Sequence, residues 1–505
     1  MSKPPTATWS YLFQLDPKRE EPLYQQLYAA LRQAILGGHL RAGTLLPPTR
    51  VLAAELAVSR TTIVTAFEQL SAEGYLEARV GAGTFVASTL PEEMLHVQAQ
   101  QAPLERTEKL PRLSQRSQRL LHSPLVPRLQ APSTKAFQPG LPAVDEFPFA
   151  VWSRLAAKHS QHPPFELLAY GDPAGYRPLR EAIAHYLTAS RAVRCQPEQV
   201  LIVSGAQQAI DITARTLLEE DDVVWVEDPG YLRAQGTFRE VGAKIVAVPL
   251  DQEGLNVEAG KRLSEKPQLV YVTPSHQYPL GITMSLTRRL ALLDWAQRVG
   301  TWILEDDYDS EFRYRGRPLA SLQGLDTHGH VIYMGTFSKV LFPALRLGYL
   351  VLPPELMEPF LTMRAVCGRH CPTLEQAMLT DFITEGHFLR HIRRMRSLYA
   401  HRQQILIEAV RQELHGAIEL EEHEAGMHMI GWLPQGLDDC LVSQRAAQQG
   451  IDVPALSACS QQKPERPGLL LGYAGVNEQE IHEGVKHLAS VLEEQAIWQQ
   501  FGIEG

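Results

Sequence analysis

Residues 335–339 of the chain read Gly-Thr-Phe-Ser-Lys, and Arg346 follows the lysine after seven positions. The segment places one amine, that of Lys339, among small hydroxyl side chains and near a guanidinium group. Pyridoxal phosphate needs this combination, because a lysine amine condenses with its aldehyde while hydroxyl, N–H and guanidinium groups neutralise its phosphate. Ser-Lys pairs are common, so the interpretation also depends on the sequence around this motif.

The size and composition of the chain limit the classes of protein to which it can belong. With 505 residues it is too long for one ordinary core, so we expect at least two domains. No apolar run approaches the roughly 20 residues of a membrane span, and the first ten residues lack the apolar core of a secretory signal. Five scattered cysteines are typical of a reducing compartment. We therefore expect a cytoplasmic protein, associated with the nucleoid when bound to DNA.

Charge is distributed unevenly along the chain, whose formal net charge is −9. Basic residues outnumber acidic ones over residues 18–135, whereas acidic residues dominate residues 136–505. This distribution indicates a small DNA-contacting module joined to an acidic, enzyme-like body.

The N-terminal block has the pattern of a helix-turn-helix. A helix over residues 23–36 is bounded by Pro22 and by glycines, a second short helix covers 51–56, and Ser59 can cap a third that runs to about Glu73. Residues 76–86 then read as a hairpin with a glycine turn, which is typical of the wing of a winged helix. The alternative is a three-helix packing domain without DNA contact.

Residues 22–86 resemble the GntR-type winged helix-turn-helix over nearly their whole length. The resemblance implies a DNA-binding domain over residues 18–88 and gives DNA contacts to Arg50, Ser59, Arg60, Thr61, Thr62 and Gly81. Val64 stands where some members of the family carry another arginine. Residues 89–135, rich in Gln, Pro, Arg and Ser, read as a flexible basic linker.

The remaining residues, 136–505, alternate short β-branched apolar runs with longer helical patterns. Strands are expected at residues 200–203, 222–226, 244–248, 269–272, 302–304, 331–334 and 347–351. They predict a largely parallel α/β sheet buried on both faces, with ligands at the C-terminal ends of the strands.

Polar motifs follow several of these strands. Ser204-Gly205-Ala206-Gln207 opens a helix and offers N–H groups to a phosphate. Asp306 can keep a pyridine nitrogen protonated, and Tyr308 can hydrogen-bond the ring oxygen. For this acidic cluster a magnesium site or a solvated strand end remains the alternative. Cys367, His370 and Cys371 lack a second ligand pair, so helix packing explains them better than zinc; no metal site is expected.

Together these motifs resemble those of the fold-type I aminotransferases over most of residues 136–505. The resemblance implies that Lys339 forms the internal aldimine of bound pyridoxal phosphate, and it assigns the following cofactor contacts: Asp306 to the pyridine nitrogen, Tyr308 to the ring oxygen, Tyr231 to ring stacking, Ala206, Gln207, Ser338 and Arg346 to the phosphate, and Tyr170 to the phosphate of a partner subunit in a homodimer. Tyr278 joins the cofactor site at a position where many active relatives carry asparagine.

The combination of both domains resembles the MocR regulators, so we expect a pyridoxal phosphate-dependent transcription regulator. It would sense the cofactor or an amine or amino acid that forms an aldimine with it, and the DNA-binding domain could dock on the partner subunit. Residues 469–471 are leucines where active aminotransferases carry a carboxylate-binding arginine, and Arg466 is the nearest candidate. A working aminotransferase with a fused DNA-binding domain, and a vestigial fold without cofactor, remain as alternatives.

Overall fold

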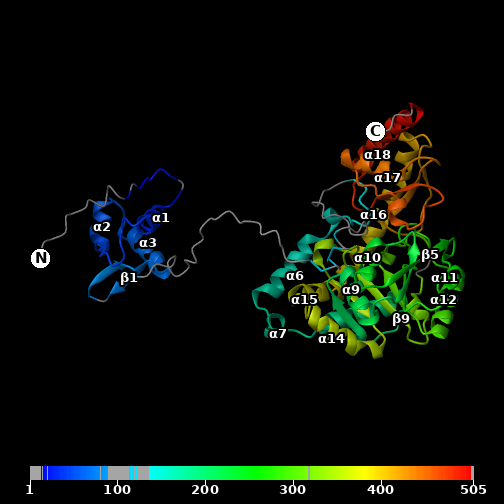
Figure 1. Ribbon diagram of the computed structural model, residues 1–505, viewed down its shortest axis with the longest axis horizontal. Helices are drawn as coiled ribbons and strands as arrows, with labels where there is room; N and C mark the ends of the chain where they lie inside the picture. The colour runs from blue at the N-terminus through cyan, green and yellow to red at the C-terminus, as the bar shows by residue number, and fades with distance from the viewer. Residues whose placement is uncertain are drawn as a thin grey trace. The chain divides into compact units, whose positions relative to one another are not determined.

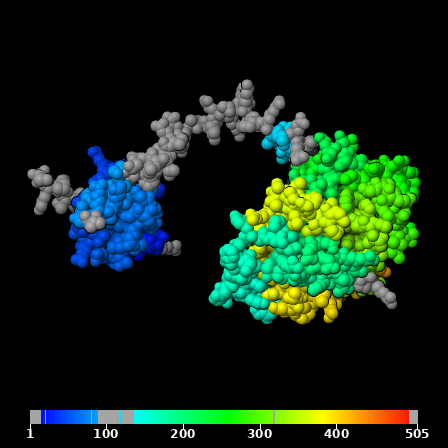
Figure 2. Space-filling model, turned by 90° about the horizontal axis from the view of Figure 1, so that it is seen from below, coloured from blue at the N-terminus to red at the C-terminus, as the bar shows by residue number. Residues whose placement is uncertain are grey.

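The computed structural model describes residue 13 and residues 15–19, 21–79, 81–88, 113–114, 117–118, 121, 136–316 and 319–501. Contacts divide the chain into two compact units, residues 1–112 and 113–505 (Figure 1; Figure 2). The expected linker, residues 89–135, lies outside the described residues apart from 113–114, 117–118 and 121. No helix within the described ranges has the length and hydropathy needed to cross a membrane.

The N-terminal unit is a three-helix core with a hairpin. Its elements are α1 (Leu23–Leu36), α2 (Thr49–Glu55), α3 (Arg60–Ala72), β1 (Leu76–Arg79) and β2 (Gly83–Val86). Leu27 and Leu31 of α1 are fully buried against Ile63 and Leu70 of α3, as the helical spacing of these apolar residues predicts. The expected helix 51–56 begins two residues earlier, because Pro48 provides its N-cap.

The hairpin closes this small core. Leu76 of β1 pairs with Val86 of β2 in antiparallel register, and both side chains are buried. Gly81 lies at the turn with a φ of +77°, a left-handed conformation that favours glycine. The predicted winged helix-turn-helix is therefore confirmed.

The second unit is built on a mixed sheet. Among the described residues the strand order is β3-β10-β9-β8-β7-β4-β5-β6. The strands are β3 (Val200–Val203), β4 (Val223–Asp228), β5 (Lys244–Asp251), β6 (Gly254–Leu255), β7 (Leu269–Val272), β8 (Trp302–Asp307), β9 (Val331–Thr336) and β10 (Gly348–Val351). Strands β5, β4, β7, β8 and β9 are parallel neighbours, whereas β10 runs antiparallel between β9 and β3. The expected, largely parallel sheet is confirmed.

Helices cover both faces of this sheet, so its strands are largely apolar, and the carboxylates of β4 and β8 are confined to the C-terminal ends of these strands. They are α6 (Phe149–Gln161), α7 (Phe165–Leu168), α8 (Arg177–Arg191), α9 (Ala206–Leu217), α10 (Leu232–Glu240), α11 (Val257–Leu263), α12 (Leu286–Val299), α13 (Leu322–Leu325), α14 (Met357–Cys367) and α15 (Thr373–Thr384). Val224 faces the core under α9 and α10, while its neighbour Trp225 stacks on Trp295 of α12 at 4.3 Å on the other face. Strand alternation thus divides the core into two layers.

A smaller lobe follows the sheet in sequence. Helix α16 (His387–Glu413) leads to β11 (Glu419–Leu420), β12 (His428–Trp432) and β13 (Gly468–Gly472), which form an antiparallel sheet, and to α17 (Asp439–Gln448) and α18 (Glu478–Phe501). Figure 1 shows this lobe in orange and red near the C-terminus. The sequence patterns did not separate it from the α/β region.

Candidate cofactor site and DNA-binding surface

The candidate site lies where the parallel strands end. Because β7, β8 and β9 run parallel, their C-terminal ends meet at one edge of the sheet. Asp306 lies at the end of β8, Thr336 ends β9, and Lys339 follows three residues later. This edge is the expected ligand position in an open α/β sheet.

Lys339 is held by the backbone of a distant segment. Its Nζ donates a hydrogen bond of 2.9 Å to the carbonyl oxygen of Gly140. Gly140 has a φ of +71°, and a Cβ there would lie 2.7 Å from Nζ, so a side chain would displace the amine. Burial lowers the pKa of Lys339, while the charges of Asp309 and Asp306 raise it. A lowered pKa increases the fraction of neutral amine, the form that attacks an aldehyde.

Asp306 presents one free carboxylate oxygen to the site. Its Oδ2 accepts a 2.6 Å hydrogen bond from the Tyr271 hydroxyl, but its Oδ1 is buried and has no partner among the described residues. Burial raises the pKa of Asp306 to about 7. A pyridinium N–H would supply both the missing donor and the opposite charge, so this carboxylate fits the nitrogen of pyridoxal phosphate.

The predicted phosphate ligands also converge. Gly205 has a φ of +90° and precedes Ala206, the first residue of α9, whose initial N–H groups point out of the helix. An Arg346 guanidinium nitrogen lies 3.4 Å from the position that a Cβ on Gly205 would take. The buried Oγ of Ser338 has no partner among the described residues. Gln207 uses its side-chain amide to donate to Thr237, which leaves its backbone N–H for an anion.

Three tyrosines border the same edge. The rings of Tyr231 and Tyr278 pack edge to face at 5.8 Å, and Tyr278 packs on Tyr308 at 6.2 Å. Burial raises the pKa of Tyr278 and of Tyr308 well above the ordinary value, so both hydroxyls stay neutral. The structure thus brings these three side chains together with the lysine motif, and their neutral hydroxyls can donate hydrogen bonds.

Two other predicted residues lie elsewhere. Tyr170 is 81% exposed, and the guanidinium of Arg369 lies 4.3 Å from the centre of its ring. Arg466 pairs with Glu419 at 2.6 Å and lies over Trp432, so its charge is engaged at the edge of the smaller sheet. Neither side chain contacts Lys339 in this chain.

Sequence reasoning missed several residues of this site: Gly140, Tyr271, His276, Asp309 and His428. Gly140 and His428 lie on segments without a recognisable pattern for this chemistry, and Tyr271 lies inside an expected strand, so only the fold brings these three to the site. His276 and Asp309 carry a signal, because His276 stands two residues before Tyr278 and Asp309 directly follows Tyr308 in the acidic cluster.

The N-terminal unit presents the predicted DNA contacts. Arg50, Ser59, Arg60, Thr61 and Gly81 are exposed, and Thr62 is half-buried. Ser59 caps α3 by accepting a 3.1 Å hydrogen bond from the backbone N–H of Thr62. Arg60 donates to the Thr49 hydroxyl at 3.5 Å, which places Thr49 beside the recognition helix as an additional candidate. Polar side chains are thus grouped at the N-terminal end of α3.

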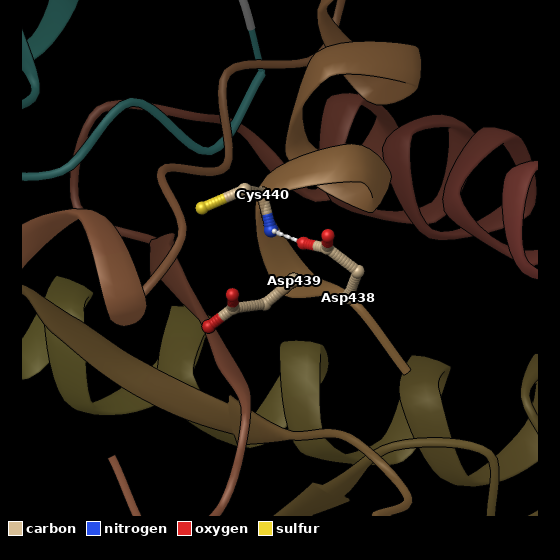
Figure 3. Close-up of side chains that lie close together, drawn as sticks. All are labelled: Asp438, Asp439 and Cys440. Atoms are coloured by element: carbon tan, nitrogen blue, oxygen red, sulfur yellow. Dashed lines mark hydrogen bonds between the residues drawn. The ribbon is translucent and has the colours of Figure 1, made fainter. Parts of the chain in front are cut away.

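A group of acidic and thiol ligands lies outside this site. Asp438, Asp439 and Cys440 come together at the start of α17 (Figure 3). Asp438 accepts from the backbone N–H groups of Cys440 and Leu441, and Asp439 accepts from Ser457 and from the N–H of Gly468. These carboxylates therefore act in capping the helix and in fixing the neighbouring loop.

Comparisons with known proteins agree with this arrangement. Residues 145–488 match the family "Aminotransferase class I and II", and residues 23–86 match "Bacterial regulatory proteins, gntR family". The chain is 43% identical to the probable rhizopine catabolism regulatory protein MocR of Rhizobium meliloti, over 95% of both chains. It is 31% identical to the pyridoxine biosynthesis transcriptional regulator PdxR of Corynebacterium glutamicum, over 88% of this chain and 90% of that one.

A solved structure shows the same likeness for the second unit. The α-aminoadipate aminotransferase LysN of Thermus thermophilus, solved with N-(5′-phosphopyridoxyl)-L-leucine, superposes with a TM-score of 0.70 at 28% identity. The match covers 76% of this chain and 98% of the enzyme.

Proposed function

Because this chain belongs to the MocR-type regulators of the GntR family, which join a winged helix-turn-helix to an aminotransferase-like domain that binds pyridoxal phosphate, we propose that it senses an amine that reacts with its bound cofactor. The observation that carries the proposal is the convergence of Lys339, the unpartnered Oδ1 of Asp306 and the Gly205–Arg346 anion site at one sheet edge. Lys339 would hold the cofactor, which supplies an aldehyde and an electron-withdrawing ring. Reaction with the amine would change how the protein binds its operator, in the cytoplasm.

The amine is recognised without the usual α-carboxylate contacts. Leu470 stands in the leucine run that replaces the arginine of active relatives, and Tyr278 stands in place of their asparagine. Both side chains pack in one apolar cluster with Leu280 and Cys459. Arg233 is exposed, and its charge lowers the pKa of Lys339, so it is a cation near the site that could bind an acidic effector.

The test is a spectral titration of the cofactor-loaded protein with 2-amino-1,3-propanediol and with L-serine. The two compounds differ only in that the first carries a CH₂OH group where serine carries its carboxylate. We expect the amino alcohol to change the spectrum at lower concentration than serine, and the change to persist without further turnover. Rapid conversion of the cofactor to its pyridoxamine form would support the aminotransferase alternative. A spectrum that no amine changes would leave the cofactor itself as the signal.

We further propose that the protein works as a homodimer. Phe165, Leu168 and Tyr170 are 80%, 64% and 81% exposed, and they line an open pocket of about 690 Å³ with residues of α15. Figure 2 shows cyan and yellow surfaces adjoining on this face of the unit. An apolar patch of this kind is typical of a protein–protein interface. In such a dimer Tyr170 would reach the phosphate bound to the partner.

Phe165→Glu is expected to shift the protein toward monomer, because it introduces a charge into the proposed interface. Its affinity for pyridoxal phosphate should fall about tenfold, the effect of losing a charge-assisted hydrogen bond of roughly 1.5 kcal/mol. Sedimentation velocity and a cofactor titration measure the two effects. Leu263→Glu, at an exposed leucine on α11, is the matched control. A Phe165→Glu protein that stays dimeric would contradict the proposed interface.

A further inference from the structure

A buried histidine–carboxylate pair lies behind Tyr308. His276 Nδ1 is 2.9 Å from Asp309 Oδ2 and 3.0 Å from the Tyr308 hydroxyl oxygen. His276 and Asp309 are 2% and 1% exposed. One ring nitrogen therefore contacts both the carboxylate and the tyrosine assigned to the cofactor's ring oxygen, and solvent is excluded from the contact.

Packing fixes the orientation of the His276 ring. Gly281 and Gly426 have φ values of +76° and +103°, and both lie against the imidazole. A Cβ on Gly426 would lie 2.1 Å from His276 Cε1, and a Cβ on Gly281 would lie 3.1 Å from His276 Nε2. A side chain on Gly426 would displace the His276 ring, whereas one on Gly281 would clash first with His423, 2.4 Å away. The absence of a side chain at Gly426 therefore leaves room for the ring where Nδ1 meets Tyr308.

The hydrogen-bond partners determine which nitrogen carries the proton. Burial lowers the pKa of His276 to about 3, so the ring is neutral and carries one N–H. Burial and the charge of Asp307 raise the pKa of Asp309 well above its ordinary value, but the charges of Lys339 and Arg191 oppose this shift and favour the carboxylate as an acceptor from Nδ1. Nδ1 faces two oxygen acceptors, whereas Nε2 is buried and has no partner among the described residues. The proton is therefore best placed on Nδ1. The Tyr308 hydroxyl oxygen lies 3.0 Å from Nδ1 on the acceptor side of this N–H. The hydroxyl proton of Tyr308 then points away from His276.

We propose that His276 and Asp309 are positioning residues that orient the Tyr308 hydroxyl as a hydrogen-bond donor toward the ring oxygen of the cofactor. This inference rests on the cofactor site proposed above. Asp309 holds the N–H tautomer of His276, and the described residues then offer the Tyr308 hydroxyl proton no acceptor. The donated hydrogen bond would favour the anionic ring oxygen.

Other charged and titratable groups face the pair. They are Asp306, Glu227 and Tyr278 around Tyr308, Arg313, His423 and His428 around His276, Asp307 and Arg191 around Asp309, and Lys339, whose pKa the Asp309 charge raises. A change at Asp309 would therefore act on Lys339 directly as well as through His276. Substitutions at His276 leave these charges in place and are the cleaner test.

The experiment follows the visible absorption of the cofactor-loaded protein against pH. A hydrogen-bond donor to the ring oxygen stabilises the anionic form of that oxygen. This stabilisation is largest after the nitrogen that links the cofactor to Lys339 has lost its proton. Without the donor, the proton on that nitrogen is therefore harder to remove. We expect Tyr308→Phe to raise the pH midpoint of the spectral change by about one unit, the size expected for one hydrogen bond to a charged group. His276→Gln, whose amide reaches only the Nε2 position, should raise it in the same direction.

His276→Asn is the matched variant, because its amide can place an N–H near the Nδ1 position. It should retain the wild-type midpoint, and the double variant Tyr308→Phe/His276→Gln should shift no further than Tyr308→Phe alone. Two outcomes would overturn the positioning role if Tyr308→Phe still shifts the midpoint. One is an equal midpoint for His276→Asn and His276→Gln, and the other is a double variant whose shift is the sum of the two single shifts. If Tyr308→Phe itself leaves the midpoint unchanged, the cofactor site as assigned is wrong. Circular dichroism and a thermal melt establish that each variant is folded.

Discussion

Lys339→Ala is expected to abolish covalent attachment of pyridoxal phosphate and to remove the visible absorption band of the loaded protein. The reason is chemical: alanine has no amine, and no other lysine lies among the site residues on the described part of this sheet edge. The fold should survive, because among the described residues the Lys339 amine makes one hydrogen bond, to the Gly140 carbonyl, and no ion pair.

The measurement is borohydride reduction of the loaded protein followed by intact mass and peptide mapping. Wild type should carry one cofactor on the peptide that contains Lys339, and the variant should carry none. Lys244→Ala removes an exposed lysine that pairs with Asp221, and it should label as wild type does. A label that persists in the Lys339→Ala protein would place the reactive amine elsewhere. Weak, non-covalent binding is still expected, because Arg346 and the N-terminus of α9 remain.

Seven of the eight described strands of the large sheet could be predicted, because each contains a short apolar, mostly β-branched run; β6, two residues long, was not predicted. Residues 200–203 and 269–272 are continuous apolar segments of this kind, and the structure has β3 and β7 at those bounds. The smaller lobe could not be separated in the same way. Paired residues of its strands β12 and β13 lie at least 36 residues apart in sequence, the separation of Trp432 from Gly468, and no hairpin turn signals their pairing.

The reactive residues of the site could be predicted where one segment carries the chemistry. Lys339, Asp306 and Arg346 each follow or precede a recognisable strand, so their position at the sheet edge follows from topology. Gly140 could not be predicted, because it lies 199 residues from the lysine that it contacts. The pairing of His276 with Asp309 likewise depends on how two loops pack, which no spacing within either loop reveals.

In the DNA-binding domain the reverse holds, because the functional residues are local. Ser59, Arg60 and Thr62 belong to one helix turn, and the N-cap hydrogen bond to Thr62 confirms how that turn begins. Capping occupies the Ser59 oxygen, so Ser59 has less capacity left to contact a phosphate. Arg60 is exposed, and among the described residues its side chain bonds only to the Thr49 hydroxyl, at the limit of hydrogen-bond distance, so its guanidinium can reach DNA.

Arg60→Ala is therefore expected to weaken operator binding by about 1–3 kcal/mol, roughly fivefold to 150-fold in Kd, if the guanidinium contacts a base edge. Gel-shift titrations at several salt concentrations measure this and separate two roles. Loss of a base contact would relax specificity at one operator position, whereas loss of a phosphate contact would weaken binding to all sequences and reduce the salt slope by about one. Arg298→Ala, an exposed arginine on α12 paired with Asp294, removes the same charge from the other unit and should leave affinity unchanged. Unchanged affinity of the Arg60→Ala protein would refute the assignment of α3 as the recognition helix, since the N-terminal end of that helix holds the side chains that the family places in the major groove.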